Sequence, residues 1–153
     1  MLVQTNRTDD RQFFTAAGTG LPYNAATTGS LRPVVAVLGN LGRVAGLGPQ
    51  LPAGWSVRAA QDIDDVLPGE IVLFTSAEEQ DIRHARSLLP RRTSIVALVD
   101  SAAPAELVAA VLTAGADVCV RGGLSAVLAS HLVACRRRQL ADRWAALAAS
   151  AQV

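Results

Sequence analysis

The 153-residue sequence contains no lysine, because all fourteen of its basic residues are arginine. This excludes Schiff-base chemistry, a lysine general base and a phosphate-loop lysine, since arginine does not lose its proton and binds phosphate differently from an ammonium group. The two cysteines, Cys119 and Cys135, show neither Cys-x-x-Cys nor Cys/His ligand spacing. We therefore expect buried, reduced thiols, with no metal and no cofactor.

Long apolar runs are also missing. No stretch approaches the 18 residues of a membrane-spanning helix, and the start, MLVQTNRTDDRQFF, lacks the basic and apolar regions of a signal peptide. With 50% hydrophobic and 18% charged residues, the chain has enough apolar surface for a proper core. We expect a cytoplasmic protein with one folded domain and no membrane partner.

No pattern in the sequence is typical of an active site. His84 and His131 fall in predicted helices, and neither belongs to a Ser/His/Asp arrangement or an acid–base pair. Gly39, Gly42 and Gly46 follow a predicted strand, but their spacing matches neither the phosphate loop nor the dinucleotide fingerprint. The sequence therefore predicts that this chain is not an enzyme and does not bind nucleotides.

The clearest structural pattern lies in residues 94–123, which predict a strand, a helix and a second strand. Residues 95–99 are a short, continuous apolar run, typical of a buried parallel strand. Pro104 is expected to begin a helix and Gly115 to end it, and residues 118–120 form the next strand. The apolar face of that helix is expected to contain Leu107, Val108, Val111 and Leu112.

Three further strands are expected at residues 33–38, 55–59 and 70–75, the second of them at an edge of the sheet. Residues 76–79 match the Ser-x-x-Glu capping box of a helix. The fold class is therefore α/β, a three-layer sandwich of the flavodoxin-like (βα)5 type with parallel strand order 2-1-3-4-5. Inward positions are expected at Ile82, Ala85, Leu88 and Leu89, and in a last helix from Leu124 at Val127, Leu128, His131, Leu132 and Cys135.

Both ends of the chain differ from this domain, which we place at residues 32–138. Residues 1–31 are rich in Thr, Gly, Asn and Ala and predict a flexible tail, in which Phe13 and Phe14 could dock on a groove of this protein or of a partner. Residues 139–153 predict a helical extension with a second apolar stripe. This extension is either an interface or linker helix, or an end that folds back. The stripe contains Val133, Leu140, Trp144 and Leu147.

The strand and helix order, the sequence Ala-Gly-Ala-Asp at residues 114–117 and the arginine cluster at residues 136–138 resemble the receiver domain of bacterial response regulators. The resemblance covers residues 33–138. It implies that Gly39 and Asn40 occupy the positions of the metal-binding acidic pair and Thr75 that of the phosphoacceptor aspartate. The switch hydroxyl falls on Val99 and the final lysine on Arg121 or Gly122. Asp100 is the carboxylate expected at this edge of the sheet.

The resemblance therefore implies a degenerate receiver that is not phosphorylated on aspartate and acts as a protein-interaction or dimerisation module. By analogy, its interface consists of the fourth helix, fifth strand and fifth helix, continued by the C-terminal extension. A role in transcriptional regulation is the leading hypothesis. The expected partner-binding residues are Leu107, Val111, Arg136, Arg137, Leu140, Trp144 and Leu147.

Three alternatives remain open. The vacated pocket at Gly39, Asn40, Thr75 and Asp100 could sense a small molecule. A localisation adaptor is a second alternative, because similar domains precede ATPases in pilus and cell-pole positioning proteins. A third is phosphate contact with nucleic acid through residues 136–138 and Arg143, although no helix-turn-helix follows in this sequence and we do not expect the chain alone to use it.

Overall fold

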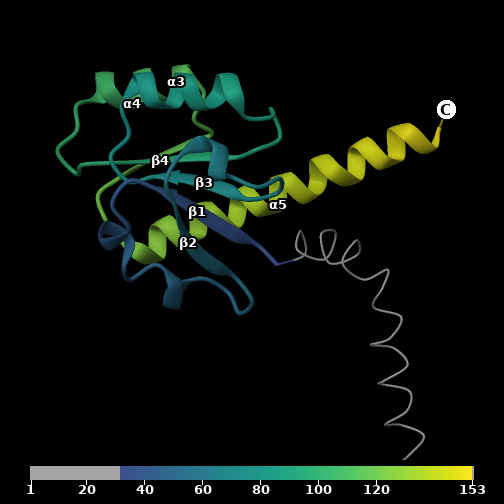
Figure 1. Ribbon diagram of the computed structural model, residues 1–153, viewed down its shortest axis with the longest axis horizontal. Coiled ribbons are helices and arrows are strands. Elements are labelled where there is room, and N and C mark those ends of the chain that lie inside the picture. The colour runs from purple at the N-terminus through teal and green to yellow at the C-terminus, as the bar shows by residue number, and fades with distance from the viewer. Residues whose placement is uncertain (1–31, 153) are drawn as a thin grey trace, which may run out of the picture. The chain divides into compact units, whose positions relative to one another are not determined.

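Five short apolar segments form one parallel sheet with the strand order β2-β1-β3-β4-β5, as the sequence predicts. The computed structural model describes residues 32–152. Each of the first four strands is followed by a crossover on one of the two faces, and β5 is followed by a long helix, which gives the expected three-layer α/β architecture (Figure 1). The strands are β1 (Val34–Leu38), β2 (Ser56–Ala60), β3 (Ile71–Phe74), β4 (Ile95–Val99) and β5 (Val118–Arg121).

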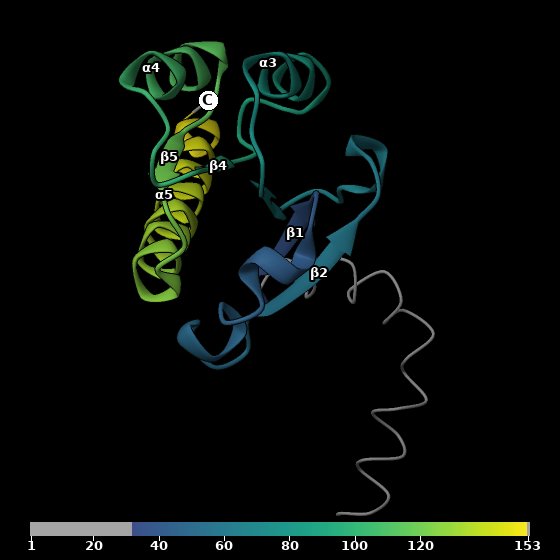
Figure 2. The same ribbon diagram turned by 90° about the vertical axis from the view of Figure 1, so that its left-hand side faces the viewer.

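The core lies on both faces of the sheet, because successive strand residues point to opposite sides. On one face Val35, Leu73 and Leu98 pack against the start of helix α5 (Ser125–Ala151). On the other face Ala36 and Val72 belong to the cluster under α3 (Glu79–Leu88) and α4 (Ala105–Ala114). The view along the sheet shows α3 and α4 together on one side and α5 on the other (Figure 2).

The first two crossovers differ from the (βα)5 expectation, since short 3-10 helices replace α-helices. The connection from β1 to β2 contains η2 (Leu41–Val44) and η3 (Gly48–Gln50), and the next contains η4 (Ile63–Asp65). Glycines and prolines interrupt the first connection, and both residue types disfavour a continuous helix. Its apolar residues still cover the sheet, because Val44, Leu47 and Leu51 are buried in the same cluster as α5.

The predicted capping box at residues 76–79 is wrong. Helix α3 begins two residues later than a Ser76 cap requires: Glu78 is the N-cap, and its side chain makes no capping hydrogen bond. Ser76 instead accepts a hydrogen bond from Arg43. Ile82 and Ala85 are buried as expected, whereas Leu88 is 55% exposed because it lies in the last turn of the helix, beyond the edge of the core.

Helices α4 and α5 also bury fewer residues than the sequence predicts. Val111 is buried in α4 and Leu112 is exposed, because these adjacent residues point about 100° apart around the helix. In α5, Leu128, Leu132 and Cys135 are buried as predicted. Val127 and His131 are exposed and do not belong to the sheet-facing side.

Helix α5 continues without a break from Ser125 to Ala151, so it passes through the predicted boundary between residues 138 and 139. The chain divides into two units, Met1–Arg32 and Pro33–Val153, and the second contains every helix and strand described here. The predicted tail and its Phe13-Phe14 pair lie outside the described residues. Within residues 32–152, no helix is both long and apolar enough to span a membrane.

Candidate functional site

The carboxyl ends of β1 and β3 are joined by a compact hydrogen-bonded cluster of Gly39, Asn40 and Thr75. The Thr75 hydroxyl is fully buried; it accepts from the Asn40 backbone N–H at 2.8 Å and lies 3.4 Å from the Leu38 carbonyl, to which it donates. Gly39 has φ +110°, and a Cβ on it would lie 2.3 Å from the Thr75 hydroxyl oxygen. The close contact therefore requires glycine at position 39 and leaves no room between the two strand ends.

A second polar cluster connects three strand ends through one arginine. Arg43, in η2, donates to the Ser76 hydroxyl after β3 and to Asp100 after β4, both at 2.9 Å. Asn40 places this arginine, because its side-chain oxygen accepts from the Gly42 N–H at 2.8 Å and caps the 3-10 helix. The result is a polar clamp of Arg43, Ser76 and Asp100 across the edge of the sheet.

A groove of about 400 Å³ lies beside this clamp. Its polar lining comes from Arg43, Ser76, Glu78 and Asp100, and Leu107 and neighbouring residues supply an apolar wall. The groove therefore opens toward the starts of α3 and α4, whereas Gly39, Asn40 and Thr75 are not among its lining residues. Sequence reasoning placed the pocket at those three residues together with Val99, Asp100 and Arg121. Of these, Val99 and Asp100 line the groove. Sequence reasoning missed Arg43, Ser76 and Glu78.

Val99 and Arg121, also expected at this edge, differ in position: Val99 lines the groove, whereas Arg121 is not among its lining residues. Val99 is buried, and its carbonyl accepts from the Gly122 N–H at 2.9 Å. Arg121, its register partner on β5, is exposed. Within residues 32–152 no three His, Cys, Asp or Glu side chains gather in a geometry that could hold a metal ion.

The residues expected to bind a partner fall into two groups, those that are buried or half-buried in the domain and those that are exposed on α5. Val111 is fully buried and Leu107 is half-buried against the same core cluster, so Val111 supports α4 from inside and offers no surface of its own. Arg136 is also buried, and it donates to Gln139 at 3.4 Å. Arg137 and the three apolar residues after it are exposed: Leu140 (36%), Trp144 (69%) and Leu147 (53%).

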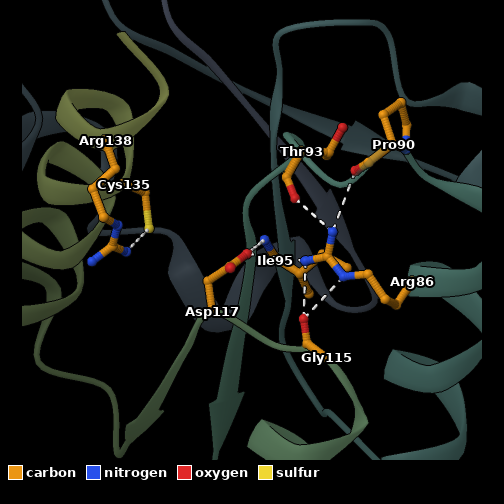
Figure 3. Close-up of polar contacts among 8 residues, drawn as sticks. All are labelled: Arg86, Pro90, Thr93, Ile95, Gly115, Asp117, Cys135 and Arg138. Atoms are coloured by element: carbon orange, nitrogen blue, oxygen red, sulfur yellow. Dashed lines mark hydrogen bonds and ion pairs between the residues drawn. The ribbon is translucent and has the colours of Figure 1, made fainter. Parts of the chain in front are cut away.

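A polar network at the opposite edge of the sheet fixes α3 and the turn before β5 (Figure 3). The Arg86 guanidinium donates to the Gly115 carbonyl at 3.1 and 2.9 Å and to the Thr93 carbonyl at 3.0 Å. It also pairs with Asp117 at 3.0 Å, and Asp117 accepts from the Ile95 N–H at 2.8 Å. Because these contacts are to backbone groups at the amino ends of β4 and β5, the network stabilises the fold and is not a site for chemistry.

The two cysteines are free thiols with raised pKa values. Desolvation by burial raises the pKa of both Cys135 and Cys119. For Cys119, the charge of Arg121 opposes this effect but is the smaller influence. Cys135 also accepts a hydrogen bond from Arg138 at 3.2 Å (Figure 3). Cys135 is buried as the sequence predicts, whereas Cys119 is only half-buried.

Comparison with known proteins places this arrangement in a known fold. No protein-family profile and no curated protein matches the sequence. The crystal structure of a two-component response regulator from Clostridium difficile is similar to this chain with a TM-score of 0.55 and 14% sequence identity. The similarity covers 69% of this chain and 96% of that chain. The protein therefore has the α/β fold of a response-regulator receiver domain.

Proposed function

We propose that this chain is a signalling domain of the receiver fold that works without aspartyl phosphorylation and acts by binding another protein. The observation that carries the proposal is the cluster of Gly39, Asn40 and Thr75. An acyl phosphate needs a carboxylate nucleophile, and the magnesium ion that assists its formation prefers carboxylate oxygen ligands. The ends of β1 and β3 offer a buried hydroxyl and backbone groups already engaged with one another.

The charge at this edge supports the same proposal. Arg43 neutralises Asp100 at 2.9 Å, so a guanidinium already occupies the surroundings of the carboxylate that follows β4. A dication would have to compete with that arginine for the same oxygen. The pair therefore weakens the attraction of Asp100 for a dication, which supports the proposal.

Phosphodonor labelling tests the proposal. The chain and a conventional receiver domain as positive control are incubated with phosphoramidate and magnesium, and the intact masses are compared. We expect a phosphoryl adduct on the control alone, and the same thermal unfolding temperature of this chain with and without beryllofluoride. A stable adduct that maps to Thr75 or Asp100 would refute the proposal.

The groove beside the clamp supports a second candidate, in which the domain senses a small molecule. It combines the Arg43 guanidinium with an apolar wall at Leu107, a pairing suited to a ligand with an anionic group and an apolar body. Arg43→Gln is the matched variant for a thermal-shift screen of organic acids. A ligand that protects the parent chain but not Arg43→Gln would support this function; protection of both equally would exclude the groove as its site.

We further propose that the interaction module serves transcriptional regulation, with α5 leading from the sheet toward an effector. A localisation role next to an ATPase is the competing assignment. Fusing the chain to a fluorescent protein distinguishes them, because a polar focus is expected of a localisation adaptor and not of a transcriptional module.

A further inference from the structure

The C-terminal half of α5 extends beyond the folded domain (Figure 1). Arg136 is the last buried residue of the helix, yet the helix continues to Ala151. About four further turns therefore project past the core. A helix of this length gains little stability by itself in water, and most protein helices are stabilised by packing an apolar face.

The exposed residues of this extension follow a heptad pattern. Trp144 and Ala151 take the a positions after Arg137, and Leu140 and Leu147 take the d positions after Val133. The alternating steps of four and three residues are those of a coiled-coil seam, in which each side chain packs into a hole on a facing helix. We call this surface the C-terminal seam: the half-buried Val133 and the exposed Arg137, Leu140, Trp144, Leu147 and Ala151.

The C-terminal seam does not compete with the sheet for the same side of α5. At about 100° per residue, it is centred roughly a quarter turn away from Leu132, which is fully buried against the sheet. A second helix can therefore lie along the seam while the first half of α5 keeps its core contacts. The residues flanking Trp144 leave room for close packing, since Ala141 and Ala148 occupy the e positions.

The charges beside the seam distinguish the two possible orientations. Arg136 and Arg143 occupy successive g positions, and burial together with the charge of Arg143 lowers the pKa of Arg136, which places both charges along one edge. In an antiparallel pair the g positions face each other, so arginine would meet arginine. In a parallel pair each g position faces an e position, and the e residues here are alanines.

We infer that the C-terminal seam forms a parallel, in-register, two-stranded coiled coil with a second copy of this chain. This deepens the proposed function, on which it rests, by naming the partner of the interaction module. The pattern is self-complementary, because a parallel pairing aligns Leu140, Trp144 and Leu147 with their own copies. In this register the two Arg137 side chains also meet at one a position, and their like charges cost some stability. A single polar residue at an a position specifies the register and the number of strands at such a cost.

Light scattering on the full chain tests the association. We expect twice the 15.9 kDa chain mass at micromolar to millimolar concentration. Leu140→Gln combined with Leu147→Gln should raise the dimer dissociation constant by at least about tenfold, because two apolar layers lose their packing. Leu88→Gln is the matched control, since Leu88 is 55% exposed and Leu147 is 53% exposed. This control should remain dimeric.

Cysteine cross-linking tests the orientation. Ala151→Cys places a thiol in the seam near the end of the helix, where a parallel pair brings the two copies together and an antiparallel pair separates them by about 27 Å. Ala145→Cys is the control on the side away from the seam. Under mild oxidation, we expect Ala151→Cys to form a disulfide-linked dimer and Ala145→Cys to remain largely monomeric on a non-reducing gel.

Each outcome decides the inference independently of phosphorylation. A monomeric parent chain would overturn the inferred dimer. It would favour the alternatives that residues 1–31 or a different protein bind the seam. Equal association of the double variant and Leu88→Gln would place the dimer interface elsewhere. Equal cross-linking at residues 145 and 151 would overturn the parallel register. Phosphoryl labelling of a chain that dimerises through the seam would instead refute only the proposed function.

Discussion

Arg86→Ala should destabilise the domain more than any substitution of an exposed arginine. Its guanidinium joins the C-terminal turn of α3 to the start of β4 and to the turn after α4 (Figure 3). The side chain is only 21% exposed, so water cannot replace all of its contacts. The variant should therefore report how strongly this one residue holds three elements together.

The expected loss follows from the contacts. A hydrogen bond from a charged donor contributes about 1.5–3 kcal/mol, and Arg86 makes partly buried bonds to the carbonyls of Gly115 and Thr93. The exposed contacts to Pro90 and Asp117 add less than about 1 kcal/mol. In the variant, water can hydrogen-bond to the vacated carbonyls and so recover part of the free energy that these contacts contribute. We expect the free energy of unfolding to fall by about 3 kcal/mol and Tm by roughly 10–15 °C.

Urea titration followed by circular dichroism measures this change. Arg83→Ala is the control, because Arg83 pairs with Glu79 on the exposed side of the same helix and should contribute less than about 0.5 kcal/mol. Arg86→Lys should recover less than half of the loss, since one ammonium cannot reach all of these carbonyls. A loss below about 1 kcal/mol in Arg86→Ala would refute the reasoning.

Three further substitutions or measurements follow from the described contacts. Thr75→Asp should remain unlabelled by phosphoramidate and magnesium in intact-mass analysis, because the end of β1 supplies no carboxylate beside it; labelling would contradict this. Glu70→Gln should lower the free energy of unfolding by about 1–2 kcal/mol in urea titration, because Glu70 is buried and accepts from Arg58 at 2.8 and 2.7 Å. At neutral pH, Cys135 should react with maleimide more slowly than Cys119, because burial raises the pKa of both thiols and Cys119 is the more exposed. Peptide mass spectrometry measures the two rates, and faster reaction at Cys135 would be inconsistent with its burial.

The central strands β1, β3 and β4 could be predicted from the sequence because they are buried on both faces. Runs such as residues 34–38 and 95–99 are continuously apolar and rich in valine, and their length excludes most helices. The strand order followed from the fold class and not from any residue pattern. The first two crossovers were harder to predict, since Leu47 and Leu51 cover the sheet from 3-10 turns whose spacing has no helical period.

Helix positions near the ends of α3 and α4 were predicted less well. Leu88 and Leu112 match the apolar spacing of their helices, yet both are exposed, because a periodic pattern does not show how far the neighbouring core extends. The capping box failed for a related reason. Ser76 has the correct spacing for a cap, but Arg43 supplies a competing hydrogen bond from a distant part of the sequence.

The candidate site was only partly predictable for the same physical reason. The resemblance placed Gly39, Asn40 and Thr75 at neighbouring strand ends, and the structure brings these residues together. The clamp depends on contacts between residues far apart in the chain, such as Arg43 with Asp100. Residue types alone do not predict which arginine reaches which carboxylate, because the path of the β1–β2 connection decides it.

Helix α5 shows why the sequence could indicate the C-terminal seam but not its geometry. Cys135 and Leu140 belong to two apolar stripes that overlap in sequence and point in different directions. The periodicity of the whole helix therefore does not indicate one apolar face. The structure separates them, because the stripe containing Cys135 is used by the sheet whereas Leu140 is exposed. Since one rigid helix carries both stripes, the angle between them is fixed, and a partner at the seam would sit at a defined angle to the sheet.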